Sequence, residues 1–145
     1  MRRLTAFLTA LTVALLSASV AGEARAPAYE IIVSPSNSIA VIDREFLAEA
    51  FLKKSTEWPS GETVKPVDLP PSSPVRRRFS DDVLHRSVAE VKSYWQQRIF
   101  AGRDTPPPEL DGDDDVVHYV LKHPGAVGYV SVSAALAGAK VVAIR

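Results

Sequence analysis

Apolar and polar residues along this chain follow two different periods, which predict strands alternating with helices. The β-branched run Tyr29–Val33 is typical of a buried strand, and so are the apolar runs 127–131 and 141–145. A further short strand is predicted over 64–69, where Pro66 shortens it or places it at a sheet edge.

Four other segments have the spacing of an amphipathic helix. The first follows Asp43, the predicted N-cap, with an apolar face of Phe46, Leu47, Ala50 and Phe51. The second begins at Ser73-Pro74, and its inward face is formed by Val75, Phe79 and Val83. The third has a Ser87/Glu90 capping box and a buried stripe of Val88, Val91, Trp95 and Ile99. The fourth follows the acidic run 111–115 and buries Val116, Val117, Val120 and Leu121. The order predicts an α/β fold with a small mixed or parallel sheet flanked by helices.

The first 28 residues have a different pattern. Positive Arg2 and Arg3 precede an apolar run over 4–16 and the small residues Ser19-Val20-Ala21, which predicts a cleaved signal peptide over 1–21. The alternative is an N-terminal membrane anchor, although the run is shorter than the roughly 20 residues that span a bilayer. We expect a flexible lead-in over 22–28, one domain over 29–145, and a periplasmic or secreted location.

Composition narrows the function classes. The 145 residues include 17 basic and 17 acidic side chains, so the formal net charge is zero and nothing favours a nucleic-acid partner. The chain has no cysteine, which excludes disulfides, thiolate nucleophiles and cysteine metal sites.

The Ser73-Pro74 helix start is the first candidate site. A helix N-terminus offers free backbone N–H groups to an anion, and a cap serine can add its hydroxyl. Arg76 lies one turn on and can add charge-assisted hydrogen bonds. The alternative is that Ser73 only caps the helix and the arginines form a solvated face.

The polar loop 34–38 is the second candidate, because ligands of open α/β sheets bind beyond the carboxyl ends of strands. Ser36 and Asn37 are its candidate donors. The alternative is an ordinary polar turn.

Other chemistry has weaker support. The aspartates at 111–115 lack the glutamate that completes a calcium loop, and His118 and His123 are five apart rather than four, so we expect no metal. A triad of Ser73, Asp81 and His85 lacks a nucleophile-elbow motif, so we expect no enzyme and no cofactor.

Several segments resemble the phosphate ABC transporter substrate-binding proteins. Phe46–Gly61 is similar to a family helix ending in Ile-Phe-Leu-Gly-Lys that is followed by a tryptophan and a turn. Val67–Phe79 resembles the stretch carrying the family's Ser-Gly-Thr phosphate loop, and Val88–Trp95 also matches. Gly125–Val130 resembles the signature Gly-Ala-Ile-Gly-Tyr-Val. Together the matches cover about 29–131.

The resemblance implies one lobe of a type II periplasmic-binding-protein-like fold, whose full-length members close two lobes around phosphate. Ser73 stands at the family's loop serine, but Pro74 and Val75 replace glycine and threonine. Leu69 stands where the family has its phosphate-clamping arginine, and Arg76 is the hypothetical replacement.

We therefore expect an exported solute-binding-like protein that binds phosphate or another small oxyanion through Ser36, Asn37, Ser73 and Arg76. An ABC transporter permease or another periplasmic protein is the implied partner, and a homodimer would supply the missing wall of the site. The alternative is a protein-interaction or accessory module that has lost its ligand.

Overall fold

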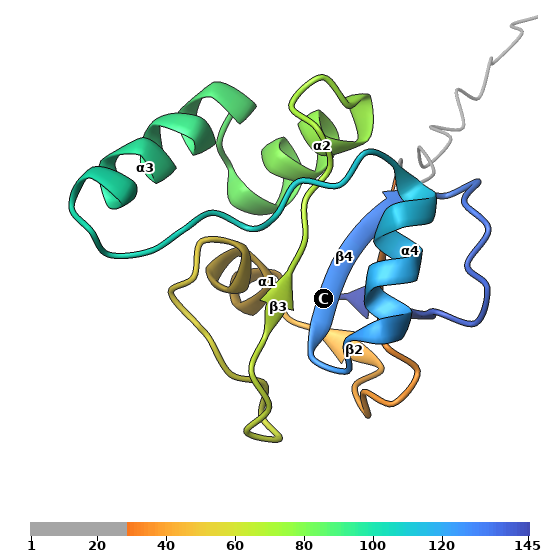
Figure 1. The fold of residues 1–145 in the computed structure, drawn as a ribbon. Coiled ribbons are helices and arrows are strands. Elements are labelled where there is room, and N and C mark those ends of the chain that lie inside the picture. The colour runs from red at the N-terminus through yellow and green to blue at the C-terminus, as the bar shows by residue number, and fades with distance from the viewer. Residues whose placement is uncertain (1–28) are drawn as a thin grey trace, which may run out of the picture.

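The computed structural model describes residues 29–145, so the predicted signal peptide (1–21) and lead-in (22–28) lie outside the described residues. Five strands form one sheet: β1 (Tyr29–Val33), β2 (Val41–Ile42), β3 (Lys65–Pro66), β4 (Ala126–Ser131) and β5 (Lys140–Ile144). The helices are α1 (Arg44–Phe51), α2 (Pro74–Phe79), α3 (Val88–Phe100) and α4 (Asp113–Lys122), with a π-helical turn, η1 (Ser80–Leu84), directly after α2 (Figure 1).

The sheet is mixed, which is one of the two arrangements that the sequence predicts. Its strand order is β2-β5-β1-β4-β3. The central strand β1 is antiparallel to β4 and to β5, while the outer strands β2 and β3 are parallel to their neighbours. The α/β class is confirmed, whereas β2 was missed because two residues have no readable period.

Helices cover both faces of the sheet, and adjacent residues of β4 show how. On one face, a Cβ at Gly128 would lie 2.6 Å from Val116 Cγ1, so the missing side chain lets α4 pack closely. On the other face, Tyr129 is stacked on Phe79 of α2 with ring centroids 3.9 Å apart. Phe51 of α1 contacts the same two rings. The core therefore extends on both sides of β1 and β4.

The predicted strand over 64–69 is much shorter in the structure. Pro66 confines β3 to two residues at the sheet edge, as its missing N–H predicts. The chain still continues beside β4, because the N–H of Val67 donates to the carbonyl of Val127. Residues 67–69 thus leave the sheet next to β4 and lead into α2.

Three helices start where the sequence predicts, whereas α4 begins inside the acidic run, at Asp113, and the cap of α1 differs from the prediction. Ser87 and Glu90 form the expected capping box of α3. Asp43 is the N-cap of α1 by backbone conformation, but its carboxylate pairs with Arg145 instead, at 2.6 Å between Oδ1 and Nε. A competing guanidinium thus takes the carboxylate from the helix N–H groups.

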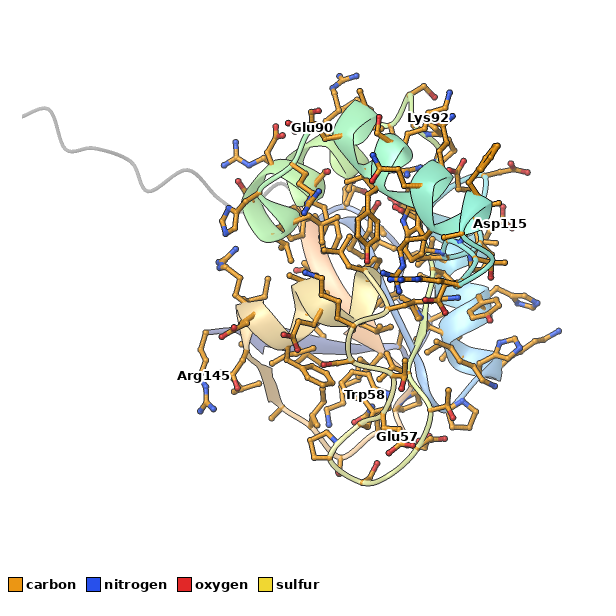
Figure 2. The ribbon with its side chains drawn as sticks, turned by 90° about the vertical axis from the view of Figure 1, so that its left-hand side faces the viewer. Glu57, Trp58, Glu90, Lys92, Asp115 and Arg145 are labelled. Atoms are coloured by element: carbon orange, nitrogen blue, oxygen red, sulfur yellow. The ribbon has the colours of Figure 1, made fainter. Side chains whose placement is uncertain are left out.

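The predicted stripe of α3 is correct only in part. Val91 and Trp95 are buried, but Ile99 is 53% exposed and Phe100 is 98% exposed. The last turn of α3 extends beyond the sheet (Figure 1), and so the expectation of a buried Ile99 was wrong. Glu90 and Lys92 lie on the outer side of the same helix (Figure 2). Within 29–145, no helix combines the length and apolarity needed to cross a membrane.

Candidate functional site

The start of α2 is built as the sequence predicts. Ser73 is the N-cap, Pro74 occupies the first helical position, and Ser73 Oγ accepts the N–H of Arg76 at 3.2 Å. The α-helical part is only six residues long, because the π-turn η1 follows at Ser80. The serine hydroxyl oxygen is therefore already engaged in the cap.

Arg76 does not lie on a solvated face. Its side chain is 7% exposed, and its Nη1 donates to the carbonyl of Leu69 at 2.7 Å and to Glu109 Oε1 at 2.9 Å. Its Nη2 lies 3.3 Å from Asp68 Oδ2. Two carboxylates and one carbonyl thus surround the guanidinium that the sequence assigned to an anion.

Tyr129 completes this group, which we name the Asp68–Arg76 cluster (Asp68, Arg76, Glu109 and Tyr129). The Tyr129 hydroxyl donates to Asp68 Oδ1, which also accepts the N–H of Leu69 at 3.0 Å. Burial raises the pKa of Asp68, and the Arg76 charge and these hydrogen bonds oppose that rise. Burial also raises the pKa of Tyr129, with the Asp68 carboxylate adding to the effect.

The cluster links four segments of the chain. Arg76 belongs to α2, Tyr129 to β4, Asp68 to the segment leaving β3, and Glu109 to the long connection between α3 and α4. Backbone hydrogen bonds reinforce the link, since Asp68 N–H donates to Pro108 and its carbonyl accepts from Leu110. The arrangement is that of a buried ionic crosslink.

Ser36 and Asn37 lie elsewhere. Val33, just before their loop, pairs with Val127, whereas Tyr29 at the other end of β1 contacts Phe79 of α2 at 5.7 Å between ring centroids. The loop is therefore at the opposite end of β1 from Ser73 and Arg76. In Figure 1 the loop that follows β1 (orange) lies at the bottom of the view and α2 at the top. The structure does not bring the four predicted residues to one site.

The loop makes its own hydrogen bonds. Ser36 Oγ lies 2.8 Å from Ser34 Oγ, and Asn37 Oδ1 accepts the N–H of Ile39 at 3.0 Å. Lys140 donates to the carbonyl of Asn37 at 2.9 Å. Asn37 Nδ2 is buried and has no partner among the residues described. This is mainly the pattern of a polar turn.

The residues considered for metal or triad chemistry make other contacts. Asp113, in the first turn of α4, accepts hydrogen bonds from the N–H and hydroxyl of Ser131. No group of three or more metal-ligating side chains lies together in residues 29–145. Over the same range, Ser73, Asp81 and His85 share no hydrogen bond with one another.

Sequence reasoning missed Asp68, Glu109 and Tyr129. The strand prediction held no signal for a buried Asp68, because in a strand that buries Val67 and Leu69 the side chain between them points to the opposite face. The structure nevertheless buries Asp68, and a buried acid needs a partner. The sequence does not indicate which arginine pairs with Asp68, because Arg76 is followed directly by Arg77 and Arg78.

Comparison with known proteins places the fold. No protein-family model matches the sequence, and no match is found among curated proteins. Solved structures do match: an ABC-type phosphate transport receptor from Vibrio cholerae has a TM-score of 0.62 at 16% identity over 81% of this chain and 46% of the receptor. A putative phosphate ABC transporter substrate-binding protein with bound phosphate, from Clostridium perfringens, has a TM-score of 0.64 at 16% identity, over 81% of this chain and 44% of its own.

A possible phosphate binding protein from Planctomyces limnophilus is also similar, with a TM-score of 0.58 at 16% identity over 81% of this chain and 41% of its own. The chain thus spans less than half the length of these structures. At this identity the likeness concerns the fold, and it confirms the expected single lobe: the chain has the α/β fold of about half of a phosphate ABC transporter substrate-binding protein.

Proposed function

We propose that this chain is an exported accessory protein that uses a solute-binding fold without the phosphate clamp of the proteins it resembles. The observation that carries the proposal is the environment of Arg76. Its guanidinium is buried against Asp68 and Glu109, so an oxyanion would have to displace two carboxylates to reach it. Leu69, at the family's arginine position, is 2% exposed and offers no charge.

The proposed partner is an ABC transporter permease or another periplasmic protein. A second copy of the chain is the other proposed partner. The sequence pattern of residues 1–21 supports export. We assign no catalytic step, and the solved structures with this fold are described as a transport receptor and as binding proteins.

A second function, weak binding of phosphate or a similar oxyanion at Ser73, is favoured by the likeness to a structure with bound phosphate. In that case Ser73 would donate its hydroxyl and Arg76 would supply charge, with Ser36 and Asn37 as donors of the other loop. Such binding must release Arg76 from the Asp68–Arg76 cluster, so we expect its affinity to be low.

Isothermal titration of the purified protein with inorganic phosphate separates the two proposals. We expect no binding heat at about 1 mM phosphate. A Kd of about 1 mM corresponds to a binding free energy of only about −4 kcal/mol. Ser73→Gly removes the hydroxyl and keeps an acceptable N-cap, and Ser87→Gly makes the same change at the start of α3. Binding heat that Ser73→Gly abolishes and Ser87→Gly leaves intact would overturn the first proposal in favour of the second.

A further inference from the structure

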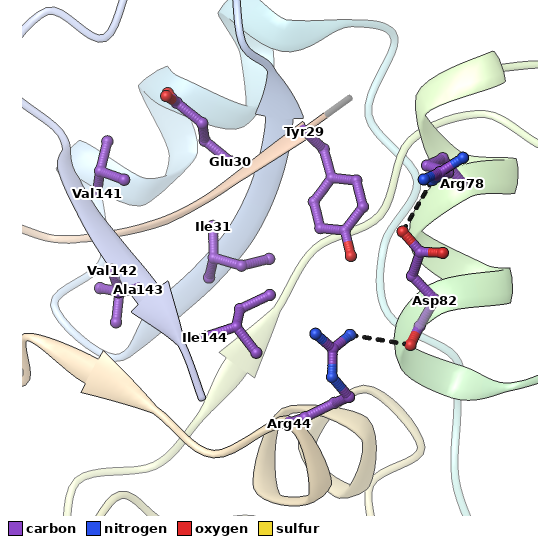
Figure 3. Close-up of a pocket in the computed structure, with 10 residues that line it drawn as sticks. All are labelled: Tyr29, Glu30, Ile31, Arg44, Arg78, Asp82, Val141, Val142, Ala143 and Ile144. Atoms are coloured by element: carbon purple, nitrogen blue, oxygen red, sulfur yellow. Dashed lines mark hydrogen bonds and ion pairs between the residues drawn. The ribbon is translucent and has the colours of Figure 1, made fainter. Parts of the chain in front are cut away.

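A pocket of about 470 Å³ lies apart from the Asp68–Arg76 cluster, between the sheet and the helices α1 and α2–η1 (Figure 3). Its apolar lining includes Ile144 of β5, which is partly exposed, and Ile31 and Val142, which are buried at 1% and 2% exposure. Its polar side carries Tyr29, Arg44, Arg78 and Asp82. This volume lies within the roughly 300–1,000 Å³ of pockets that hold small molecules.

The two arginines of the pocket are not equivalent. Arg78 is paired with Asp82, at 2.9 Å between Nε and Oδ2. Arg44 instead donates from Nη1 to the backbone carbonyl of Asp82 at 3.0 Å. No carboxylate of residues 29–145 lies within ion-pair distance of Arg44. The Arg44 guanidinium therefore retains both its charge and most of its donors.

Tyr29 places a second polar group beside that charge. The residue is 6% exposed, so its ring is buried, and its hydroxyl points toward the Arg44 guanidinium (Figure 3). Burial and then the nearby Asp82 charge raise the pKa of Tyr29, while Arg44 opposes the rise, so the hydroxyl keeps its proton at neutral pH. Glu30 also lines the pocket, but its carboxylate points away from Arg44 in the same view.

We propose that this pocket binds a small organic carboxylate with an apolar body about the size of a phenyl ring. The carboxylate would accept hydrogen bonds from Arg44 and the Tyr29 hydroxyl, and the apolar body would lie against Ile144, the partly exposed member of the apolar lining. The inference goes beyond the proposed function and does not depend on it.

Charge and donor number favour a carboxylate over phosphate. A carboxylate has two oxygens, which match the two donors that no carboxylate pairs with on this side of the pocket, the Arg44 guanidinium and the Tyr29 hydroxyl. Phosphate would place further oxygens against the apolar lining, where nothing pairs with them, and its extra negative charge would lie near Asp82. An apolar molecule without charge would leave the Arg44 guanidinium unpaired beneath it.

The test is an NMR titration of the purified protein with phenylacetate, with its neutral isostere phenylacetamide and with inorganic phosphate, each to about 20 mM, well above a millimolar Kd. We expect phenylacetate to shift the amide signals of Ile31 and Val142 and to bind about tenfold more tightly than phenylacetamide, as a charge-assisted contact implies. Equal binding of the two, preference for phosphate, or no shift with phenylacetate would overturn the proposal.

Variants locate the charge that matters. Arg44→Gln should weaken phenylacetate binding about tenfold, and Arg77→Gln should leave it unchanged, because Arg77 is an exposed arginine of α2 that does not line the pocket. Tyr29→Phe keeps the buried ring, removes one hydrogen bond and should weaken binding by about fivefold. If Arg44→Gln does not fold, Tyr29→Phe carries the test, and wild-type affinity in a folded variant of either kind would contradict the proposal.

Discussion

Replacing Arg76 with methionine tests whether this arginine holds the lobe together or serves a ligand. Methionine keeps most of the apolar stem and removes the guanidinium. The change leaves Asp68, whose side chain is 9% exposed, without its ion-pair partner, and the Leu69 carbonyl without its 2.7 Å donor. We expect Arg76→Met to destabilise the fold strongly with no ligand present.

The structure sets the magnitude. Removing one partner of a buried ion pair costs about 3–5 kcal/mol, because it leaves an uncompensated charge. Glu109 adds at most about 1 kcal/mol, since its side chain is 48% exposed and water can replace the arginine. The hydrogen bonds from Tyr129 and Leu69 still reach Asp68, which places the expected loss near the lower limit, at about 3 kcal/mol. That is a large part of the roughly 5–15 kcal/mol of an ordinary domain.

The assay is urea unfolding monitored by tryptophan fluorescence, because Trp58 and Trp95 are both buried in the folded state and become exposed on unfolding. Arg77→Met is the matched control and should lie within about 0.5 kcal/mol of wild type, since Arg77 is exposed. In Arg76→Met the Asp68 carboxyl takes up a proton more readily, so the deficit should shrink as the pH falls. Equal stability of the two variants would refute the crosslink, and a phosphate response lost without a change in stability would assign Arg76 to a ligand.

Three other predictions concern the free energy of unfolding. Gly128→Ala should lower it by about 1–3 kcal/mol, because the new Cβ would lie 2.6 Å from Val116; a change below about 0.5 kcal/mol in urea unfolding contradicts this packing. Ser87→Ala should lower it by about 1 kcal/mol through loss of the capping box, and an unchanged urea midpoint would be evidence against the cap. Burial raises the pKa of Asp68 above 3.8, so its contribution to stability is present below that value and is lost as the pH rises through the raised pKa. The free energy of unfolding of wild type minus that of Asp68→Asn should therefore fall as the pH rises from 3.8 through the raised pKa of Asp68. Urea unfolding at several pH values measures this difference, and a difference that rises with pH would contradict the prediction.

Much of the fold was predictable because its signals are local. β1, the four helices, the capping box of α3 and the proline-shortened edge strand each follow from a few neighbouring residues. Where a side chain has a competing partner far along the chain, the local signal misleads. Asp43 is the instance, since Arg145 takes its carboxylate from the helix start.

The candidate site was less predictable for the same reason. Ser73 was correctly placed at the helix start, but the environment of Arg76 depends on Glu109, which is 33 residues away in sequence. The opposite placement of Ser36 and Ser73 depends on the register of β1 against β4. Neither relation leaves a periodic trace in the sequence, so composition and spacing could not distinguish a crosslink from an anion site.

The motif Gly125–Val130, which carries part of the family resemblance, lies at positions with packing roles. A Cβ at Gly125 would collide with the carbonyl of Thr63, and the Gly125 carbonyl accepts the indole N–H of Trp58 at 3.0 Å. The next glycine, Gly128, admits α4, and Tyr129 holds Asp68. Each of these features has a structural role within one lobe.

The positions that depart from the family pattern lie elsewhere, in the turn before α2. Leu69 is buried in the core, and Pro74 and Val75 form the first turn of α2 in place of the family's glycine and threonine. On our proposal, a chain with these packing residues and without the family's anion donors would fold as a single lobe but would not clamp phosphate. This division between the two sets of positions is the physical argument for an accessory role, and the phosphate titration of wild type and Ser73→Gly tests it directly.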